Sequence, residues 1–287
     1  MKRESPPDRV AAPLRDGSRL TIEIPSSGPL FEGHFPGRPI LPAVGLLDRA
    51  LRALAAAGAP PALRGIVTLR LRRVVAPGDV LELHVQALAP DGRARLEVRR
   101  SAEVVAHGIV LLGEPSPGTG AGAPAPGLRP VAVDEGRARA PQSASGVPEL
   151  DDLLPHRPPM RFVEGIESET DDGVVCAVRV PERSAFNAGG SAPALVALEM
   201  AAQTAAVCEA LRRFRETGDA GARVGYLVGA RDVRFARTSL PVGETLFAAV
   251  RLSGIALPLC TYAFDVARES EVVASGTVST WLTATGA

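Results

Sequence analysis

A histidine in a proline-rich loop is the clearest candidate for chemistry in this sequence. Residues 31–48 read FEGHFPGRPILPAVGLLD, so His34 is followed by three prolines and then by a predicted helix. The prolines restrict the backbone and fix where the imidazole points. The first turn of the helix offers N–H groups that can polarise a carbonyl oxygen. This combination suits abstraction of a proton next to a carbonyl group, with a purely structural loop histidine as the alternative.

The chain contains an internal repeat. Residues 65–79 match residues 229–244, with one residue inserted between the two copies. Each copy is followed by an alternating strand and later by a closing strand, at residues 80–85 and 103–108 in the first half and at residues 245–250 and 271–276 in the second half. Such self-similarity indicates two equivalent structural modules.

Each module has one apolar helix followed by a run of strands. The helices are predicted at residues 41–57 and 193–217. The second helix is apolar almost all round, so other elements must cover it. Hairpin signals such as APDG at residues 89–92 separate the strands. We therefore predict an α+β fold in which an antiparallel sheet curls around the helix of each module.

The two modules are separated by a segment with a different composition. Residues 115–147 are rich in Pro, Gly, Ala and Ser, and they offer too few large apolar groups to offset the entropy of ordering. We interpret them as a linker between a first module at residues 1–114 and a second at residues 148–287. The linker contains a formal G-x-G-x-x-A match, but no strand precedes it and prolines follow it, so we exclude a nucleotide site.

Composition excludes several classes of function. The 32 Lys and Arg residues balance 32 Asp and Glu residues, which argues against a general nucleic-acid binder. No apolar run approaches the ~20 residues that cross a bilayer, and no secretory signal is visible, so we expect a cytoplasmic protein with no membrane partner. The three cysteines lie far apart and the four histidines lack the spacing of zinc ligands, so we expect no metal.

Three motifs resemble one known family. Residues 33–40, GHFPGRPI, followed by Pro42, closely resemble the signature of hot-dog-fold 3-hydroxyacyl-[acyl-carrier-protein] dehydratases. Residues 153–164, LLPHRPPMRFVE, resemble the N-terminal segment of these enzymes, and residues 198–203, LEMAAQ, resemble their helix motif E-x-x-A-Q. The resemblance covers nearly all of the chain outside the first ~15 residues and the linker. It implies a double hot dog, with two antiparallel sheets each wrapped around a long central helix.

The resemblance also implies an asymmetric pair of sites. In this family the loop histidine of one hot dog pairs with the helix carboxylate of the other. Counting fourteen residues on from His34 reaches Asp48, and counting fourteen back from Glu199 reaches Ala185, so the second module has lost the histidine. We therefore expect one composite catalytic site per chain, made by His34 and Glu199, and a degenerate second site in which Asp48 faces Ala185.

Further roles follow from the same resemblance. The backbone N–H of Ala43 is expected to donate to the thioester carbonyl, although the family usually has glycine there. The carbonyl of Ile40 is expected to hold the other ring nitrogen of His34. Glu199 would hold or protonate the departing hydroxyl, and whether that proton comes from Glu199 or His34 stays open. We interpret His156 as structural and Gln203 as closing a hydrogen bond between helix and sheet.

The implied activity is dehydration of a (3R)-hydroxyacyl thioester on an acyl carrier protein, giving the trans-2-enoyl thioester in fatty-acid-like or polyene biosynthesis. No cofactor is expected. Carrier proteins are acidic, so a basic patch is expected at the tunnel mouth. A solvated strand face is the alternative meaning of the candidate residues, which are Arg70, Arg72, Arg73, Arg93 and Arg95.

Two other functions remain open from the sequence. A hot-dog thioesterase or a CoA-linked enoyl hydratase would share the fold, but thioesterases generally lack the G-H-F-P-G loop. A catalytically silent acyl-binding scaffold would fit Ala185 but not the retained His34 and Glu199. Assembly beyond an internal pseudo-dimer into a homo-oligomer is also open.

Overall fold

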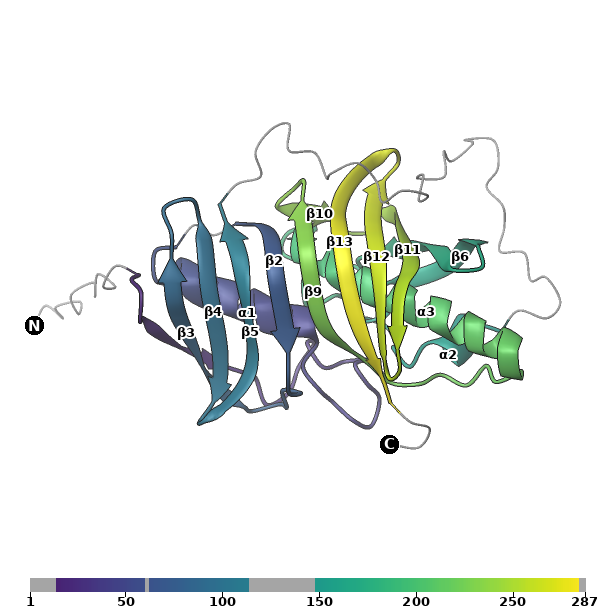
Figure 1. Ribbon diagram of the computed structural model, residues 1–287, viewed down its shortest axis with the longest axis horizontal. Helices are drawn as coiled ribbons and strands as arrows, with labels where there is room; N and C mark the ends of the chain where they lie inside the picture. Colours follow the sequence, from purple (N-terminus) through teal and green to yellow (C-terminus); the bar gives the residue numbers. More distant parts are fainter. Residues whose placement is uncertain (1–13, 60–61, 114–147, 284–287) are drawn as a thin grey trace, which may run out of the picture.

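Eleven antiparallel strands form one sheet that runs through the described part of the protein (Figure 1). The computed structural model describes residues 14–59, 62–113 and 148–283, so the predicted linker at residues 115–147 lies outside the described residues. The strand order is β1-β3-β4-β5-β2-β9-β13-β12-β11-β7-β6. A separate two-stranded sheet pairs β8 with β10.

The sheet divides into two halves that follow the sequence repeat. The first half contains β1 (Arg19–Glu23), β2 (Leu63–Leu71), β3 (Val80–Leu88), β4 (Arg93–Arg100) and β5 (Glu103–Leu112). The second contains β6 (Val163–Glu169), β7 (Gly173–Arg179), β9 (Gly225–Phe235), β11 (Thr245–Ala256), β12 (Leu259–Arg268) and β13 (Glu271–Leu282), with the short β8 (Ser191–Pro193) and β10 (Ser239–Pro241) beside them.

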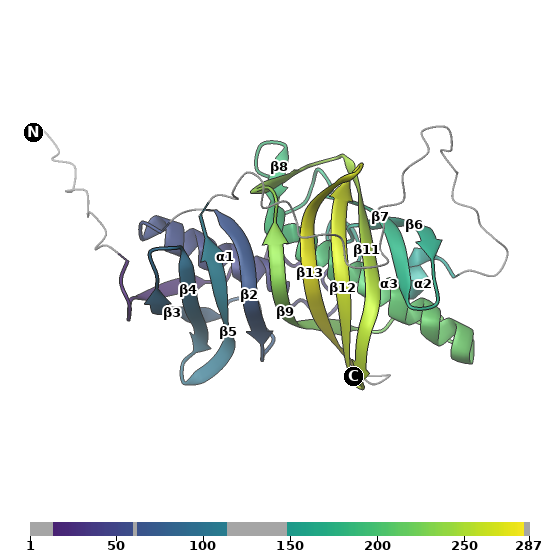
Figure 2. The same ribbon diagram turned by 45° about the horizontal axis from the view of Figure 1, so that its top comes forward.

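One helix of each module lies behind the sheet in both views (Figures 1 and 2). Helix α1 (Ala43–Ala56) buries Val44, Leu47 and Leu54, whose spacing places them on one face. Helix α3 (Ala197–Thr217) follows a short 3₁₀ turn, η1 (Ala194–Val196), and packs against β6, β7, β11, β12 and β13. It ends at Gly218, whose φ of 74° is the left-handed conformation typical of a helix C-cap.

Most of helix α3 is buried. By length and composition alone, Ala194–Thr217 is apolar enough to cross a membrane, but 89% of that apolar window is buried inside the protein. This is the behaviour of a core helix. A third helix, α2 (Leu150–Leu153), makes a single turn against it.

The two modules join edge to edge through β2 and β9. The antiparallel register pairs Gly65 with Arg234 and Arg70 with Gly229. A Cβ at Gly65 would lie 2.7 Å from the carbonyl oxygen of Val233, so only glycine allows this close approach. The two sheets predicted from the sequence are therefore continuous with each other, and one hydrophobic core spans both modules.

The predicted helices differ from the observed ones mainly at their starts, and α1 also ends one residue earlier than predicted, at Ala56. Helix α1 begins at Ala43 rather than at residue 41, because Pro42 is extended with a ψ of 145° and a proline disfavours the helical conformation of the residue before it. Residues 194–196 form the 3₁₀ turn rather than regular helix. The alternating strands predicted in both repeats lie within β3, β5, β11 and β13.

A second contact between the modules involves two loops. The backbone N–H of Arg157 donates to the carbonyl oxygen of Gly33 at 3.0 Å. Gly33 has a φ of 80°, and a Cβ there would lie 1.9 Å from the carbonyl oxygen of Arg157. The loop that carries His34 is thereby held against the segment that carries His156.

Gly33→Ala should destabilise this junction. The added Cβ meets backbone, which cannot move aside as a flexible side chain can. Gly37→Ala is the matched control, because Gly37 has a similar φ of 76° and open space around its Cβ position. In urea unfolding, we expect Gly37→Ala to cost about 1–2 kcal/mol, the price of the left-handed conformation, and Gly33→Ala to cost clearly more. Equal losses would contradict the close packing.

Candidate active site

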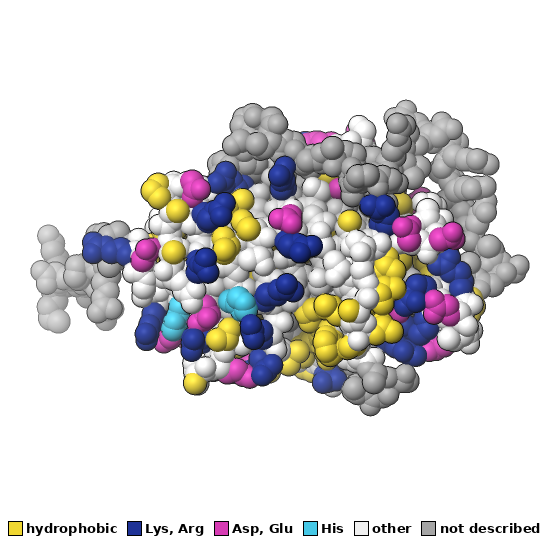
Figure 3. Space-filling view, viewed as in Figure 1, with side chains coloured by type: hydrophobic (Ala, Val, Ile, Leu, Met, Phe, Trp, Pro, Cys, Tyr) yellow, Lys and Arg dark blue, Asp and Glu magenta, His cyan; other side chains and the backbone are white. Residues whose placement is uncertain are grey.

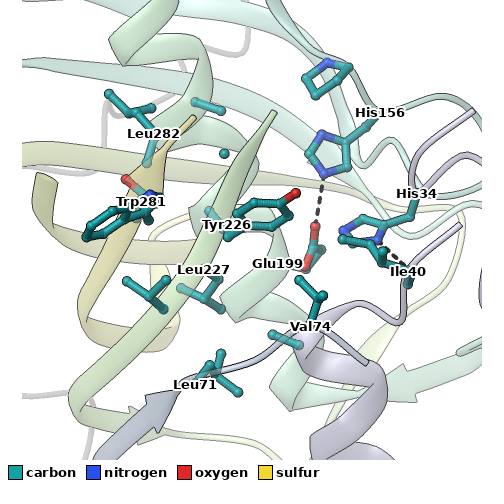
Figure 4. Close-up of a pocket in the computed structure, with 18 of the residues that line it drawn as sticks. His34, Ile40, Leu71, Val74, His156, Glu199, Tyr226, Leu227, Trp281 and Leu282 are labelled. Atoms are coloured by element: carbon teal, nitrogen blue, oxygen red, sulfur yellow. Dashed lines mark hydrogen bonds and ion pairs between the residues drawn. The ribbon is translucent and has the colours of Figure 1, made fainter. Parts of the chain in front are cut away.

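A cavity of about 510 Å³ lies between the two modules and receives side chains from both. The loop before α1 and the segment after β2 form one side of it, and α3, β9 and β13 form the other (Figure 4). The residues that line this cavity include His34, Ile40, Ala43, Arg72, Arg73, Val74, His156, Glu199, Tyr226 and Trp281.

His34 is held by its own loop in one orientation. Its side chain is buried, and Nδ1 lies 3.1 Å from the carbonyl oxygen of Ile40. The loop is closed by the backbone N–H of Ile40, which donates to the carbonyl of His34 at 3.1 Å. Because a carbonyl oxygen only accepts, the proton lies on Nδ1 and the lone pair on Nε2. Figure 4 shows this second nitrogen on the side of Glu199.

Burial keeps the His34 ring neutral. It lowers the pKa of His34 to about 4; the charge of Glu199 raises that pKa and His156 lowers it further, but burial dominates. A neutral imidazole with a free Nε2 lone pair is a proton acceptor across the physiological pH range.

Glu199 lies in the first turn of α3 and is only 4% exposed. Its Oε1 accepts a hydrogen bond from Gln203 Nε2 at 3.1 Å and lies 3.5 Å from His156 Nε2. Burial alone would raise the pKa of the carboxyl, but the hydrogen bond from His156, the charges of both imidazoles and the Gln203 amide hold it below its usual value. Glu199 is therefore an ionised carboxylate.

Gln203 connects α3 to the segment before β6. Its Oε1 accepts from the backbone N–H of Phe162 at 2.8 Å, and its Nε2 donates to the carbonyl of Met160 at 2.7 Å. This is the helix-to-sheet connection predicted from the sequence. It has the additional effect of fixing which end of the amide faces Glu199.

His156 is the site residue that sequence reasoning missed. The sequence suggests a structural residue, but the side chain is 6% exposed and lines the cavity. Its ring centroid lies 5.3 Å from that of His34 and 4.8 Å from that of Phe35. One signal could have found it: like His34, it stands in a proline-stiffened segment, PHRPP.

His34, His156 and Glu199 are also the described residues whose donor atoms come close enough to surround a metal ion, all within 4.8 Å of one another. The cluster is assembled from three segments, so the histidine spacing in the sequence could not reveal it. His156 Nε2 lies 3.5 Å from Glu199 Oε1, and a hydrogen bond from this ring lowers the pKa of the carboxyl, so its proton occupies the place where a metal bound by both atoms would lie. We therefore assign the cluster to proton chemistry and assign no metal ligand in it.

The carboxylate of the first module has a different environment. Asp48 accepts a hydrogen bond from Arg52 Nε at 2.7 Å, one helical turn away on α1. Ala185 is partly buried and packs against the hydrophobic core. Neither residue lines the cavity that contains His34 and Glu199.

The five predicted basic residues do not form one group. Arg72 and Arg73 line the cavity, whereas Arg70 on β2 and Arg93 and Arg95 on β4 are exposed and do not. Two other arginines that line the cavity were not predicted: Arg213 in the last part of α3 and Arg223 in the connection between α3 and β9. Nothing in the sequence marks these segments as part of the site.

Exposed apolar side chains accompany the basic ones at the cavity. Val74 is 49% exposed and Trp281 is 45% exposed, and both line it. Figure 3 shows hydrophobic side chains gathered over the lower ends of the central strands, with Lys and Arg side chains on either side. We call Arg72, Arg73, Val74 and Trp281 the rim of the cavity.

Comparison with known proteins gives one family match for each module. Residues 14–109 match the ApeI-like family, described as ApeI dehydratase. Residues 148–285 match the ApeP-like family, described as ApeP dehydratase. The two halves of the chain are thus similar to two different dehydratase families.

Curated relatives include the 3-hydroxyacyl-[acyl-carrier-protein] dehydratases FabZ of two bacteria. That of Caldicellulosiruptor saccharolyticus is 33% identical over 94 residues, covering 29% of this chain and 67% of the relative. That of Chloroflexus aggregans is 43% identical over 93 residues, covering 28% of this chain and 61% of the relative. The chain thus spans about three fifths to two thirds of the length of these relatives.

A solved structure extends the similarity over both modules. The dehydratase domain of PpsC from Mycobacterium tuberculosis, in complex with C12:1-CoA, superposes with a TM-score of 0.62 at 16% identity. The match covers 92% of this chain and 93% of that chain. At this identity the likeness concerns the fold, and the predicted double hot dog is confirmed.

The burial of His34 predicts an unusual titration. In NMR spectra recorded against pH, the His34 ring should titrate near pH 4 instead of near the ordinary value of 6.5, because burial disfavours the charged ring. The chain has four histidines, so His34→Gln identifies the resonance by its loss. A His34 ring that titrates near 6.5 would contradict the buried position.

Proposed function

The chain belongs to the hot-dog 3-hydroxyacyl-[acyl-carrier-protein] dehydratase family, and on that premise we propose that it removes water from a (3R)-hydroxyacyl thioester to give the trans-2-enoyl thioester. One observation carries the proposal: a neutral imidazole with a free lone pair and an ionised carboxylate, from different modules, face one buried cavity. These are the two groups that an elimination next to a carbonyl requires.

In this mechanism His34 is the base. Its Nε2 takes the α-proton, and the electron pair of the C–H bond moves into the new double bond. The pKa of the ring is low for a base, so the site must also stabilise the negative charge that develops on the thioester oxygen. The hydrogen bond from Nδ1 to Ile40 keeps the reactive nitrogen in place throughout.

The start of α1 supplies that stabilisation. Ala43 is the first residue of the helix and lines the cavity with His34. The first N–H groups of a helix have no intrahelical partner, and the helix dipole places partial positive charge there. We assign the Ala43 N–H as the donor to the thioester oxygen. Ala43 can replace the glycine that the family usually has at this position, because the role requires only the backbone N–H.

Glu199 holds the β-hydroxyl that departs. As an ionised carboxylate it accepts a hydrogen bond from this hydroxyl rather than donating a proton. The C–O bond breaks, and the hydroxide takes the proton that His34 received from the α-carbon. Water leaves, and both residues return to their starting protonation states.

We further propose that the two modules act as an internal pseudo-dimer with one working site per chain. The ion pair of Asp48 with Arg52 and the alanine at residue 185 support an inactive second site. The thioester is proposed to arrive on an acyl carrier protein, at the rim, in fatty-acid-like or polyene chain building. The mixture of basic and apolar side chains at the rim supports an acidic partner.

The test is dehydration of a 3-hydroxyacyl-carrier-protein by the purified chain, followed as loss of water by mass spectrometry. His34→Ala should lower kcat/KM by about 10²–10⁴-fold, because it removes the base. Glu199→Gln should reduce turnover strongly, and Asp48→Asn should leave it near the wild-type rate. Equal losses from the two carboxylate variants would contradict a single site. If the wild type gives no product with acyl chains of several lengths, carried either on a carrier protein or on CoA, the result would favour a catalytically silent acyl-binding scaffold.

Carrier docking at the rim predicts a substrate-dependent effect. Arg72→Ala with Arg73→Ala should raise KM for the carrier-bound substrate severalfold, because each exposed ion pair contributes up to about 1 kcal/mol, and added salt should reduce the difference. KM for a short pantetheine thioester should change little. Arg93→Ala with Arg95→Ala is the matched control, since these exposed arginines lie outside the cavity. Equal effects of the two pairs would contradict docking at the rim.

A further inference from the structure

The hydrogen bonds around Gln203 determine where the protons lie next to Glu199. The backbone N–H of Phe162 must donate to Gln203 Oε1, and the carbonyl of Met160 must accept from Gln203 Nε2. The amide therefore presents its NH₂ group to Glu199, and Oε1 of the carboxylate is an acceptor.

The same oxygen lies 3.5 Å from His156 Nε2. A hydrogen bond from the His156 ring contributes to the lowered pKa of Glu199, and a carboxylate oxygen only accepts, so we infer that the proton of His156 lies on Nε2. Its Nδ1 is buried and has no hydrogen-bond partner in the described part of the chain. A proton there would be an unpaired buried donor, which favours the neutral Nε2–H ring. The two imidazoles of the site thus hold opposite tautomers.

Both donors reach the same carboxylate oxygen. Glu199 Oε1 accepts from the Gln203 amide and from the His156 ring, whereas Oε2 has no hydrogen-bond partner among the described residues. The carboxylate cannot rotate without losing both contacts. The free oxygen is consequently the one available to a substrate hydroxyl.

The duplication provides an internal comparison. Asp48 and Glu199 occupy matching helix positions, and the residue four positions later is Arg52 in one case and Gln203 in the other. Arg52 alone holds Asp48 by an ion pair. The segment PHRPP occurs once in the chain, so only the module that keeps the helix glutamate also keeps this histidine.

We propose that His156 is a positioning residue: together with Gln203 it holds the Glu199 carboxylate in the one orientation that accepts the substrate's β-hydroxyl. This role rests on the proposed dehydratase function and extends it. His156 acts through Glu199 and transfers no proton itself.

Other titratable groups line the same cavity as Glu199. His34 faces it from the loop before α1, and His156 from the segment after α2. The remaining titratable or charged residues of the cavity are Arg72, Arg73, Glu209, Arg213, Arg223 and Tyr226. The His156 variants change none of these, but any loss of the His156 ring also raises the pKa of His34. A difference between the pH profiles of His156→Leu and His156→Gln is therefore the measure of the contact with Glu199, because both variants lack the ring and only glutamine keeps a donor.

The first experiment compares His156→Leu with His156→Gln in the dehydration assay. Leucine removes the donor, and we expect kcat to fall by about 10–100-fold, as for a misplaced catalytic group, with little change in KM. The acidic limb of the pH profile should move to higher pH, because a carboxylate that loses a donor is protonated more easily. Glutamine keeps an N–H donor and should restore the limb and much of kcat. His84→Leu, on β3, is the control and should behave as wild type.

A double-mutant cycle separates positioning from general damage. In the Glu199→Gln background, His156→Leu should have little further effect, because the group it positions is already changed. Full additivity, or equal losses in the leucine and glutamine variants with an unmoved pH profile, would show that His156 only supports the fold. Thermal unfolding of each variant identifies loss caused by misfolding.

A second experiment does not depend on activity. Nitrogen NMR of the ¹⁵N-histidine-labelled chain distinguishes the two tautomers, and the chain has four histidines to assign. We expect an Nε2–H ring for His156 that is perturbed in Glu199→Gln, and an Nδ1–H ring for His34. An Nδ1–H ring for His156 would overturn the proposal. If the wild type shows these tautomers but no dehydration, the proposed function fails while the contact itself is established.

Discussion

The packing of Gly33 against the backbone of Arg157 is the constraint on which the site depends. It joins the loop of one module to the segment of the other, with the carbonyl of Arg157 where any larger residue would place its Cβ. His34 follows Gly33 directly, and His156 precedes Arg157 directly, so the same contact sets the distance between the two imidazoles. The pairing of β2 with β9 then supplies the rigid frame that keeps this junction closed.

Duplication has given two matching carboxylates opposite environments. Asp48 forms an ion pair with Arg52 across one helical turn, and the arginine side chain is exposed. Glu199 is buried without an arginine, and its charge is stabilised by hydrogen bonds and neighbouring rings instead. A buried carboxylate held in this way is costly to desolvate. Under the proposed function, that cost is tolerated because the carboxylate oxygen must face a substrate.

The sequence predicted the parts of the site that lie within one segment. The loop around His34 and the start of α1 are contiguous, so the family motif could be recognised there, and the resemblance implied the bond between His34 and Ile40. Contacts between segments were less accessible. The role of His156 depends on a loop packing against another module, and the union of two sheets depends on which strand edges meet. Neither is encoded in local periodicity.

The low pKa of His34 and the ionised Glu199 are two consequences of the same enclosure. Burial disfavours charge on the imidazole, whereas hydrogen bonds and the neighbouring imidazole rings keep charge on Glu199 in the same cavity. A site arranged in this way begins with one fixed negative charge and one neutral base. In the proposed reaction a proton moves from a substrate carbon to His34, and the new positive charge on the ring would develop beside the carboxylate. Under that proposal the cavity stabilises the charge-separated stage of the reaction more than its start, which is what catalysis requires.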